Sequence, residues 1–156
     1  MNLSRIAPLS PGLEFCLSLI RGYAALSRRF DGRLGSWHGI SFADFAILLR
    51  LRQSPDARLR RVDLAEQLGL TASAVTRALI PLEKIGLVLR KADPNDRRVG
   101  YASLTAAGRR ILDEALESAE MISREIVPER GEDVVAFTRL LDRVAGREPE
   151  RAAARR

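Results

Sequence analysis

Two short helical patterns follow one another in residues 62–85, and only the tight turn at 69–71 separates them. The first pattern covers about two turns and ends at Gly69, the residue type that most often terminates a helix. Thr71 is a favourable N-cap for the second pattern, which predicts a helix from residue 72 to about residue 85. This order, with a short first helix bracing a second, is that of a helix-turn-helix.

The second helix has two chemically different faces. Val75, Leu79 and Leu82 share one face and are predicted to be buried. The opposite face carries small polar and basic side chains, which can approach base edges in a DNA major groove. Ordinary exposed helix surface is the alternative interpretation of that face. The DNA-contacting residues predicted on this helix are Ser73, Thr76, Arg77 and Lys84.

The sequence DPNDRRVG at residues 93–100 lies between two short apolar runs and predicts the tip of a β-hairpin. Arginines at such a tip can enter the adjacent minor groove, where the electrostatic potential is most negative. We therefore predict DNA contacts for Arg97 and Arg98. Asp96 is predicted to orient an arginine through a charge-assisted hydrogen bond. A solvated turn is the alternative for all three residues.

Helical periodicity continues on both sides of this central region. The glycine-containing stretch 31–39, which includes Trp37 and His38, is predicted to be a loop. The fold class is therefore mainly α with a small β-hairpin wing. The further helices are predicted at 11–30, at 42–53, from 106 onward and at 132–144.

The sequence of residues 64–108 resembles the winged-helix core of the MarR family of transcriptional regulators. The resemblance rests on four features together: VTR in the recognition helix, LEKIGLV at its end, DPNDRR in the wing and LTAAG at the start of the next helix. It implies a single MarR-like chain, 1–156, with a winged helix-turn-helix DNA-binding lobe at 41–105. The helices at 10–40 and 106–146 are then the dimerisation region, and we expect 147–156 to be a disordered tail.

The same resemblance implies a homodimer that binds a pseudo-palindromic operator in double-stranded DNA and is released by a small phenolic or otherwise lipophilic effector. We expect such a regulator to be a repressor and to act in the cytoplasm, without a membrane partner. The net charge of +6 independently favours an anionic partner such as nucleic acid. Gly100 departs from the family pattern, because glycine in the second wing strand weakens the strand pairing.

Five ring-bearing residues near the first two helices are candidates for the effector pocket. Such a pocket needs apolar walls with few polar groups. The alternative is a loop packed down by one aromatic side chain. The candidates are Tyr23, Trp37, His38, Phe42 and Phe45.

Cys16 is the single cysteine, so an intrachain disulfide and a thiolate metal site are both excluded, and we expect no metal or other cofactor. One branch of the family senses organic hydroperoxides through a cysteine near the start of its first helix. Cys16 is therefore a candidate redox sensor. Packing as a small apolar residue at a helix interface is the alternative.

Two other classes of function are weaker alternatives. An enzyme would have to combine Cys16 with His38, which lie on different elements without a third group, so the sequence predicts no enzyme. A winged helix that binds another protein needs apolar anchors on its recognition helix. Ile80 is the residue of that face that keeps this alternative open.

Overall fold

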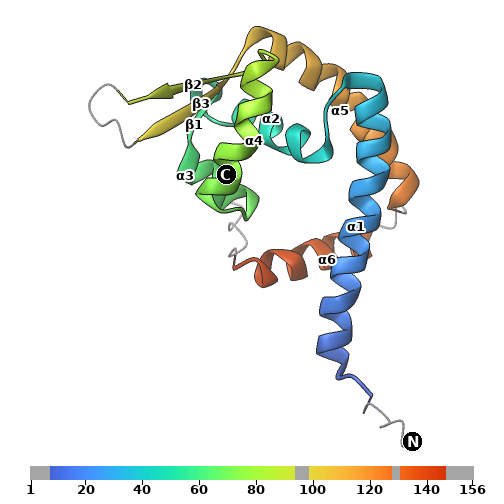
Figure 1. The fold of residues 1–156 in the computed structure, drawn as a ribbon. Coiled ribbons are helices and arrows are strands. Elements are labelled where there is room, and N and C mark those ends of the chain that lie inside the picture. The colour runs from blue at the N-terminus through green and yellow to red at the C-terminus, as the bar shows by residue number, and fades with distance from the viewer. Residues whose placement is uncertain (1–7, 94–98, 128–130, 147–156) are drawn as a thin grey trace, which may run out of the picture.

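The computed structural model describes residues 8–93, 99–127 and 131–146. Helices dominate these residues, and three short strands form one sheet, which confirms the predicted fold class (Figure 1). Within the same ranges no helix is both long and apolar enough to cross a membrane. The elements in chain order are α1 (Pro11–His38), α2 (Phe42–Gln53), η1 (Pro55–Ala57), β1 (Arg58–Arg60), α3 (Arg61–Leu68), α4 (Ala72–Lys84), β2 (Val88–Ala92), β3 (Gly100–Leu104), α5 (Ala106–Ile126) and α6 (Gly131–Val144).

Helix α1 is longer than the sequence pattern predicts. It continues through the whole stretch expected to be a loop and ends at Gly39, whose φ is 68°. The prediction of a loop at 31–39 is therefore wrong. Burial is the reason, because Phe30 and Leu34 lie one turn apart and both pack in the core. Their burial outweighs the roughly 1 kcal/mol of helix propensity that each glycine costs.

Helices α2, α3 and α4 form where they are predicted. The Ser41 hydroxyl accepts a hydrogen bond from the backbone of Asp44, and the Asp44 carboxylate accepts one from the backbone of Ser41, so α2 begins with a capping box. Helix α3 ends at Gly69, whose φ is 65°. The Thr71 hydroxyl accepts from the backbone N–H of Ala74, 3.1 Å away, and caps α4. The helix-turn-helix is thus present.

The sheet has the strand order β1-β3-β2, and both neighbouring pairs are antiparallel. Strands β2 and β3 form the predicted wing, with Val88 opposite Leu104. Strand β1 is an addition to the prediction, because three residues with Leu59 as their single apolar member are too few to show alternation. Through β1, the wing is connected directly to the start of α3.

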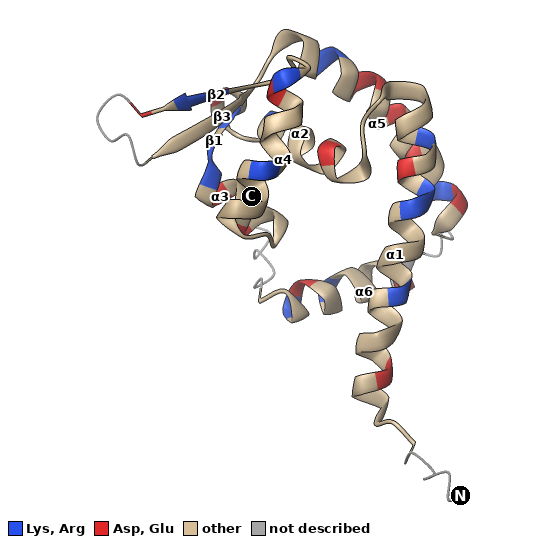
Figure 2. Cartoon of the chain, in the orientation of Figure 1, with Lys and Arg blue, Asp and Glu red and all other residues tan. Residues whose placement is uncertain are grey.

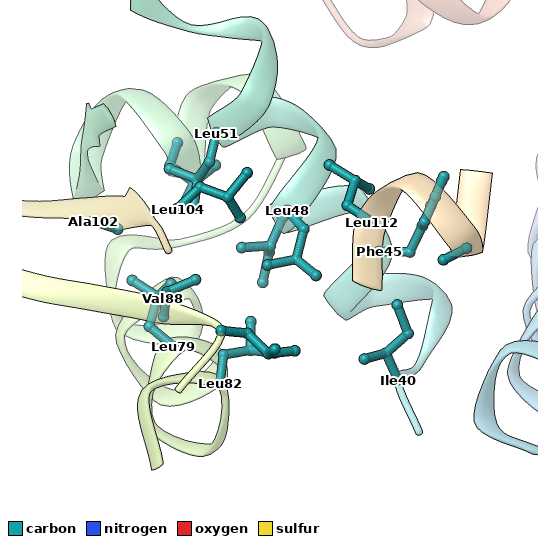
Figure 3. Packing of buried hydrophobic residues seen from close by; sticks show 14 of the residues in the cluster. Ile40, Phe45, Leu48, Leu51, Leu79, Leu82, Val88, Ala102, Leu104 and Leu112 are labelled. Atoms are coloured by element: carbon teal, nitrogen blue, oxygen red, sulfur yellow. The ribbon is translucent and has the colours of Figure 1, made fainter. Parts of the chain in front are cut away.

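One apolar core joins the recognition helix, the wing and α5 (Figure 3). Leu48 of α2, Leu79 of α4 and Leu112 of α5 are all completely buried in it. Val88 and Ala102 bring the two wing strands into the same core. Because close-packed side chains leave little room for sliding, α4 and the base of the wing are held in a fixed relative position.

Helix α5 connects this lobe to α1. Near its start, Gly108 lies so close to the chain before β2 that an added Cβ would collide with the carbonyl oxygen of Leu87. Near its end, Glu125 accepts two hydrogen bonds from the guanidinium of Arg33 in α1, at 2.7 and 2.6 Å. The N-terminal half of α1 extends well beyond the lobe and crosses α6 (Figure 1).

Candidate nucleic-acid interface

The two faces of α4 are as predicted. Val75 and Leu79 are completely buried, whereas Ser73, Arg77 and Lys84 on the other side are exposed. The capped start of α4 and its shared core with the wing fix the direction in which this exposed face points. The face offers polar and cationic groups to a partner, and the contacts of these residues with DNA stay a prediction.

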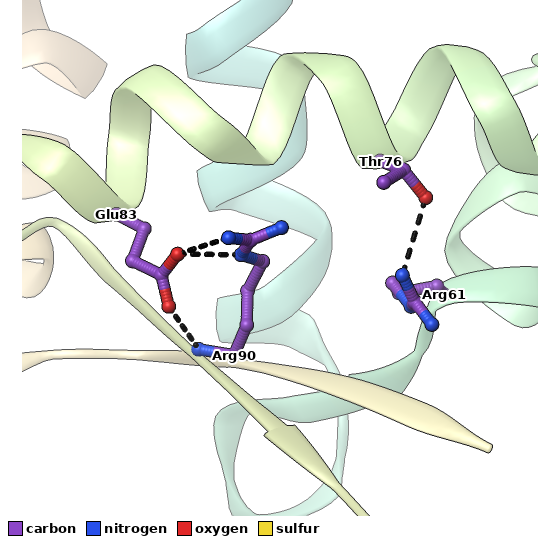
Figure 4. Close-up of polar contacts among 4 residues, drawn as sticks. All are labelled: Arg61, Thr76, Glu83 and Arg90. Carbon is purple, nitrogen blue, oxygen red and sulfur yellow. Dashed lines mark hydrogen bonds and ion pairs between the residues drawn. The ribbon is translucent and has the colours of Figure 1, made fainter. Parts of the chain in front are cut away.

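Thr76 has a different environment from its neighbours on α4. It is partly buried, and its hydroxyl donates a hydrogen bond to the carbonyl of Ala72, 2.9 Å away. The same oxygen accepts a hydrogen bond from Nη1 of Arg61 at 3.3 Å (Figure 4). The polar atom of Thr76 is therefore engaged within the protein.

A salt bridge holds the end of α4 against the wing. Nε of Arg90 in β2 donates to Oε2 of Glu83 at 2.6 Å, and the backbone N–H of Arg90 reaches Oε1 of the same carboxylate (Figure 4). The hydrogen bond from the Arg90 side chain holds the pKa of Glu83 below its usual value. The carboxylate is ionised at neutral pH, so the bridge helps to set the angle between α4 and β2.

A groove of about 490 Å³ lies between α4, the start of α3 and the start of β3. The sequence predicts the α4 wall of this groove. It does not predict the walls at the start of α3 and the start of β3, because these segments are some 40 positions apart and meet only through the pairing of β1 with β3. Arg60 and Arg61, which are adjacent at the start of α3, were a sequence signal for the α3 wall. Gly100 also lines the groove, and the residues that give it polar character are Arg60, Arg61, Ser73, Thr76 and Arg77.

The wing tip lies outside the described residues, so the predicted contacts of Asp96, Arg97 and Arg98 stay predictions. The hairpin is described up to the hydrogen bond from the backbone N–H of Asp93 to the carbonyl of Val99, 2.8 Å long. Lys and Arg positions occur on both α4 and β2 (Figure 2). Two elements of the lobe therefore supply cationic side chains.

Trp37 and His38 lie in the last turn of α1 and not in a loop, which corrects the predicted position of two effector-pocket candidates. His38 is partly buried, and its Nε2 lies 2.8 Å from the hydroxyl of Ser118 in α5. Trp37 is half exposed, with the guanidinium of Arg33 6.0 Å from its ring centroid. Both rings thus have partners near the contact between α1 and α5.

Of the other three pocket candidates, Phe42 and Phe45 stack with 6.4 Å between their ring centroids, and Tyr23 has a separate position. Phe45 is buried in the core, and Phe42 stacks on Phe30 with 4.2 Å between ring centroids. Tyr23 is exposed on α1, where it borders a cavity of about 530 Å³ between α1, the end of α5 and α6. Periodicity within one helix could not identify these walls, because they come from opposite ends of the chain. The main apolar walls are Phe15, Leu19, Leu26, Ile126, Phe137 and Leu141.

Cys16 is exposed on the N-terminal half of α1. Packing within the core of its own chain is therefore excluded, and the redox role of this thiol stays a prediction. In the part of the chain that the structure describes, no three His, Cys, Asp or Glu side chains are grouped so that they could hold a metal ion.

Comparison with known proteins gives a consistent result. The sequence profile of the MarR family matches residues 40–99. The HTH-type transcriptional regulator MhqR of Bacillus subtilis is 31% identical over 137 residues, which cover 85% of this chain and 90% of MhqR.

Two solved structures extend the likeness to nearly the whole chain. A MarR family transcriptional regulator from Streptomyces coelicolor, in complex with DNA, has a TM-score of 0.80 at 28% identity, covering 96% of this chain and 97% of that one. The organohalide-sensing transcriptional regulator RdhR, in its 2,4-dichlorophenol-bound form, has a TM-score of 0.78 at 17% identity. That match covers 94% of this chain and 89% of RdhR, and it is a likeness of fold alone.

Proposed function

This chain belongs to the MarR family and is a DNA-binding transcriptional regulator, and we propose that it acts in the cytoplasm as a homodimeric repressor. The dimer binds a pseudo-palindromic operator and releases it when a small phenolic or otherwise lipophilic effector binds. The observation that carries this proposal is the exposed polar face of α4, held beside the wing above a groove that contains three arginines. Its relatives are transcriptional regulators, so we propose no catalytic role.

Exposed apolar surface on α1 and α6 supports the homodimer. Ile20 of α1 is 66% exposed and Val144 of α6 is 61% exposed, and Leu13 and Phe137 are each about half exposed. Soluble monomers rarely leave so much apolar surface in contact with water. The terminal helices of a second copy, which carry the same surface, are the partner that would cover it.

Dimerisation would fix the distance between the two recognition helices. Two α4 helices can occupy successive major grooves on one face of the DNA only when they lie about 34 Å apart, one turn of the duplex. A two-fold symmetric dimer then requires two half-sites of opposite orientation, which is the reason for proposing a pseudo-palindromic operator.

The cavity between α1, α5 and α6 supports the effector part of the proposal. Its walls are apolar and come from the helices of the proposed dimer layer. A ligand there would change the angle between these helices and so the spacing of the α4 pair. A coupling free energy of about 1–3 kcal/mol is enough for regulation. The dichlorophenol-bound structure of RdhR makes phenols the first class of compound to test.

Fluorescence anisotropy tests the proposal on DNA from directly upstream of the gene, beside a scrambled duplex, across a salt series. We expect tight binding to the upstream duplex, two chains per site and a steep loss of affinity with salt. Equal and weak binding to both duplexes would contradict sequence-specific recognition at that site.

The effector part has its own test. We expect a phenol such as 2,4-dichlorophenol to lower the affinity of the protein for its operator. Leu19→Trp fills the cavity and should abolish this effect. In the absence of phenol, the same variant should bind DNA as the wild-type protein does. Release that persists unchanged in Leu19→Trp would place the effector elsewhere.

A further inference from the structure

Gly100 stands at the start of β3, where its backbone gives no reason for a glycine. It is paired with Ala92 of β2, and it is not among the glycines whose φ is positive. Glycine inside a strand costs stability relative to alanine, because it loses more conformational freedom on folding and has no side chain to pack. The space around Gly100 therefore has to explain its presence.

That space is filled by Arg61. A Cβ added at Gly100 would collide with Nε and Nη2 of the Arg61 guanidinium and would lie 2.6 Å from its Cζ. The Nε and Nη2 edge of the guanidinium thus occupies the space that a side chain at position 100 would need. From there its Nη1 reaches the hydroxyl of Thr76 in α4 at 3.3 Å (Figure 4). Gly100 on one side and Thr76 on the other fix the position of one arginine in the groove between wing and recognition helix.

Arg61 differs from its neighbour Arg60 because the Arg60 side chain has a carboxylate partner within the protein. Nε and Nη2 of Arg60 each donate to a carboxylate oxygen of Asp63 at 2.7 Å, so that side chain already has an anionic partner. Among the described residues Arg61 forms no ion pair, and its hydrogen bond to Thr76 is with a neutral group. Within the described residues only Nη1 of this partly buried guanidinium has a hydrogen-bond partner, and such a group suits an anion that arrives from outside.

The position of the groove indicates which anion that is. A DNA duplex separates its major groove from its minor groove by one phosphodiester strand. If α4 occupies the major groove and the wing tip the adjacent minor groove, that strand passes between α4 and β3. We propose that Arg61 binds a phosphate of this strand, and that Gly100 and Thr76 position its guanidinium for the contact. The inference rests on the proposed function, and it makes Thr76 a positioning residue in place of a base-reading one.

Gly100→Ala tests the positioning without removing the arginine. The atoms that collide belong to the end of a flexible side chain, so the fold can accommodate the methyl group by moving Arg61. We expect an unchanged thermal midpoint, and DNA affinity lower by about tenfold on operator and random duplex alike, because a phosphate contact carries no sequence information. The salt slope should fall by about one for each lost contact, hence by about two for a dimer.

Arg61→Gln completes a double-mutant cycle. It should lose as much affinity as Gly100→Ala, and Gly100→Ala should then have no further effect in the Arg61→Gln background. Thr76→Val, which keeps the shape but removes the acceptor, should reproduce part of the loss, and Thr76→Ser should restore it. Gly35→Ala, at a glycine of α1 with open space around it, and Arg52→Gln, at an arginine that pairs with Asp113 and does not line the groove, are the matched controls.

The outcomes separate this inference from the proposed function. Wild-type affinity in both Gly100→Ala and Arg61→Gln, or losses that simply add in the double variant, would overturn the inference while leaving operator binding intact. A wild-type protein with no preference for any operator would contradict the proposed function, and random duplex would still report whether Arg61 contacts phosphate. Coupled losses on both duplexes with a reduced salt slope would support the inference.

Discussion

Arg77 is the side chain on α4 that most directly tests base recognition. It is exposed on the face opposite the buried Val75 and Leu79, and it borders the groove beside the wing. Arg77→Ala should weaken operator binding by at least about tenfold, the effect of losing a bidentate contact with a base, and should weaken random-duplex binding much less. Anisotropy titrations on both duplexes measure the difference. Equal losses on the two would assign Arg77 to phosphate contact instead.

Glu83 provides a prediction about pH. Its pKa in the folded protein is lowered by the hydrogen bond from Arg90, so folding favours its ionised form. The stabilisation is present above the ordinary value of 4.5 and is lost as the pH falls through the lower folded-state value. Glu83→Gln should therefore lower the thermal midpoint at pH 7, and this difference should shrink as the pH is lowered below 4.5. Glu114→Gln, at an exposed carboxyl of α5, is the control. If Glu83→Gln lowered the thermal midpoint equally in acid, that result would argue against the salt bridge between Glu83 and Arg90.

The exposed positions of Ser73 and Arg77 on α4 could be predicted from the sequence, because helical spacing and a cap are local properties of the chain. The position of Arg61 in the same groove could not be predicted. It depends on Gly100, 39 positions later, and a strand of only three residues, which shows no periodicity, brings the two together. The alternation of arginine and leucine in β1 was the available signal, and it is too short to distinguish from chance.

At the level of whole elements, the sequence predicts where α2, α4 and α5 begin, because Ser41, Thr71 and Thr105 cap them through their own side chains. It does not predict where α1 ends. Gly32 and Gly35 are poor helix formers, and tertiary burial of the residues between and before them decides the matter. Local propensity is a weak guide wherever a helix packs against a core element distant in sequence.

The junction of the wing with α5 gives a prediction about stability. Gly108→Ala places a methyl group against the carbonyl oxygen of Leu87 and within 2.8 Å of the Leu104 side chain, and backbone cannot yield as a flexible side chain can. We expect a loss of roughly 1–3 kcal/mol in the free energy of unfolding, measured by urea titration. Gly32→Ala, in the open interior of α1, is the matched control and should stabilise the protein slightly. Unchanged stability in Gly108→Ala would show that the junction is looser than the structure indicates.

At the level of the whole molecule, the exposed half of α1 leads to a prediction about assembly. Ile20→Asp places a charge at the centre of the proposed dimer surface, where it would be desolvated without a partner. It should shift the protein from dimer to monomer in sedimentation at micromolar concentration and abolish operator binding. Val62→Asp, at an equally apolar exposed residue of α3, should leave the dimer intact. A dimeric Ile20→Asp protein would place the interface elsewhere.

The cavity between α1, α5 and α6 is the part of the molecule that the sequence predicts least well. Aromatic residues close together in the chain were the natural candidates, yet Phe42 and Phe45 contribute to packing between α1 and α2, and Tyr23 alone of the five borders the cavity. The cavity walls combine Phe15 and Leu19 with Phe137 and Leu141, more than 110 positions later. Such a combination is a property of how α1 crosses α6, and no single segment of the chain encodes it.

The projecting half of α1 also bears on how long a chain survives in the cell. A chain without a partner exposes this half-helix, including Arg21, as a segment that can open and be cut by proteases. In the proposed dimer the partner's helices cover that segment, and proteolysis then requires dissociation first. If the proposed dimer forms, the lifetime of the protein would rise with its own abundance, because surplus monomers would be degraded first.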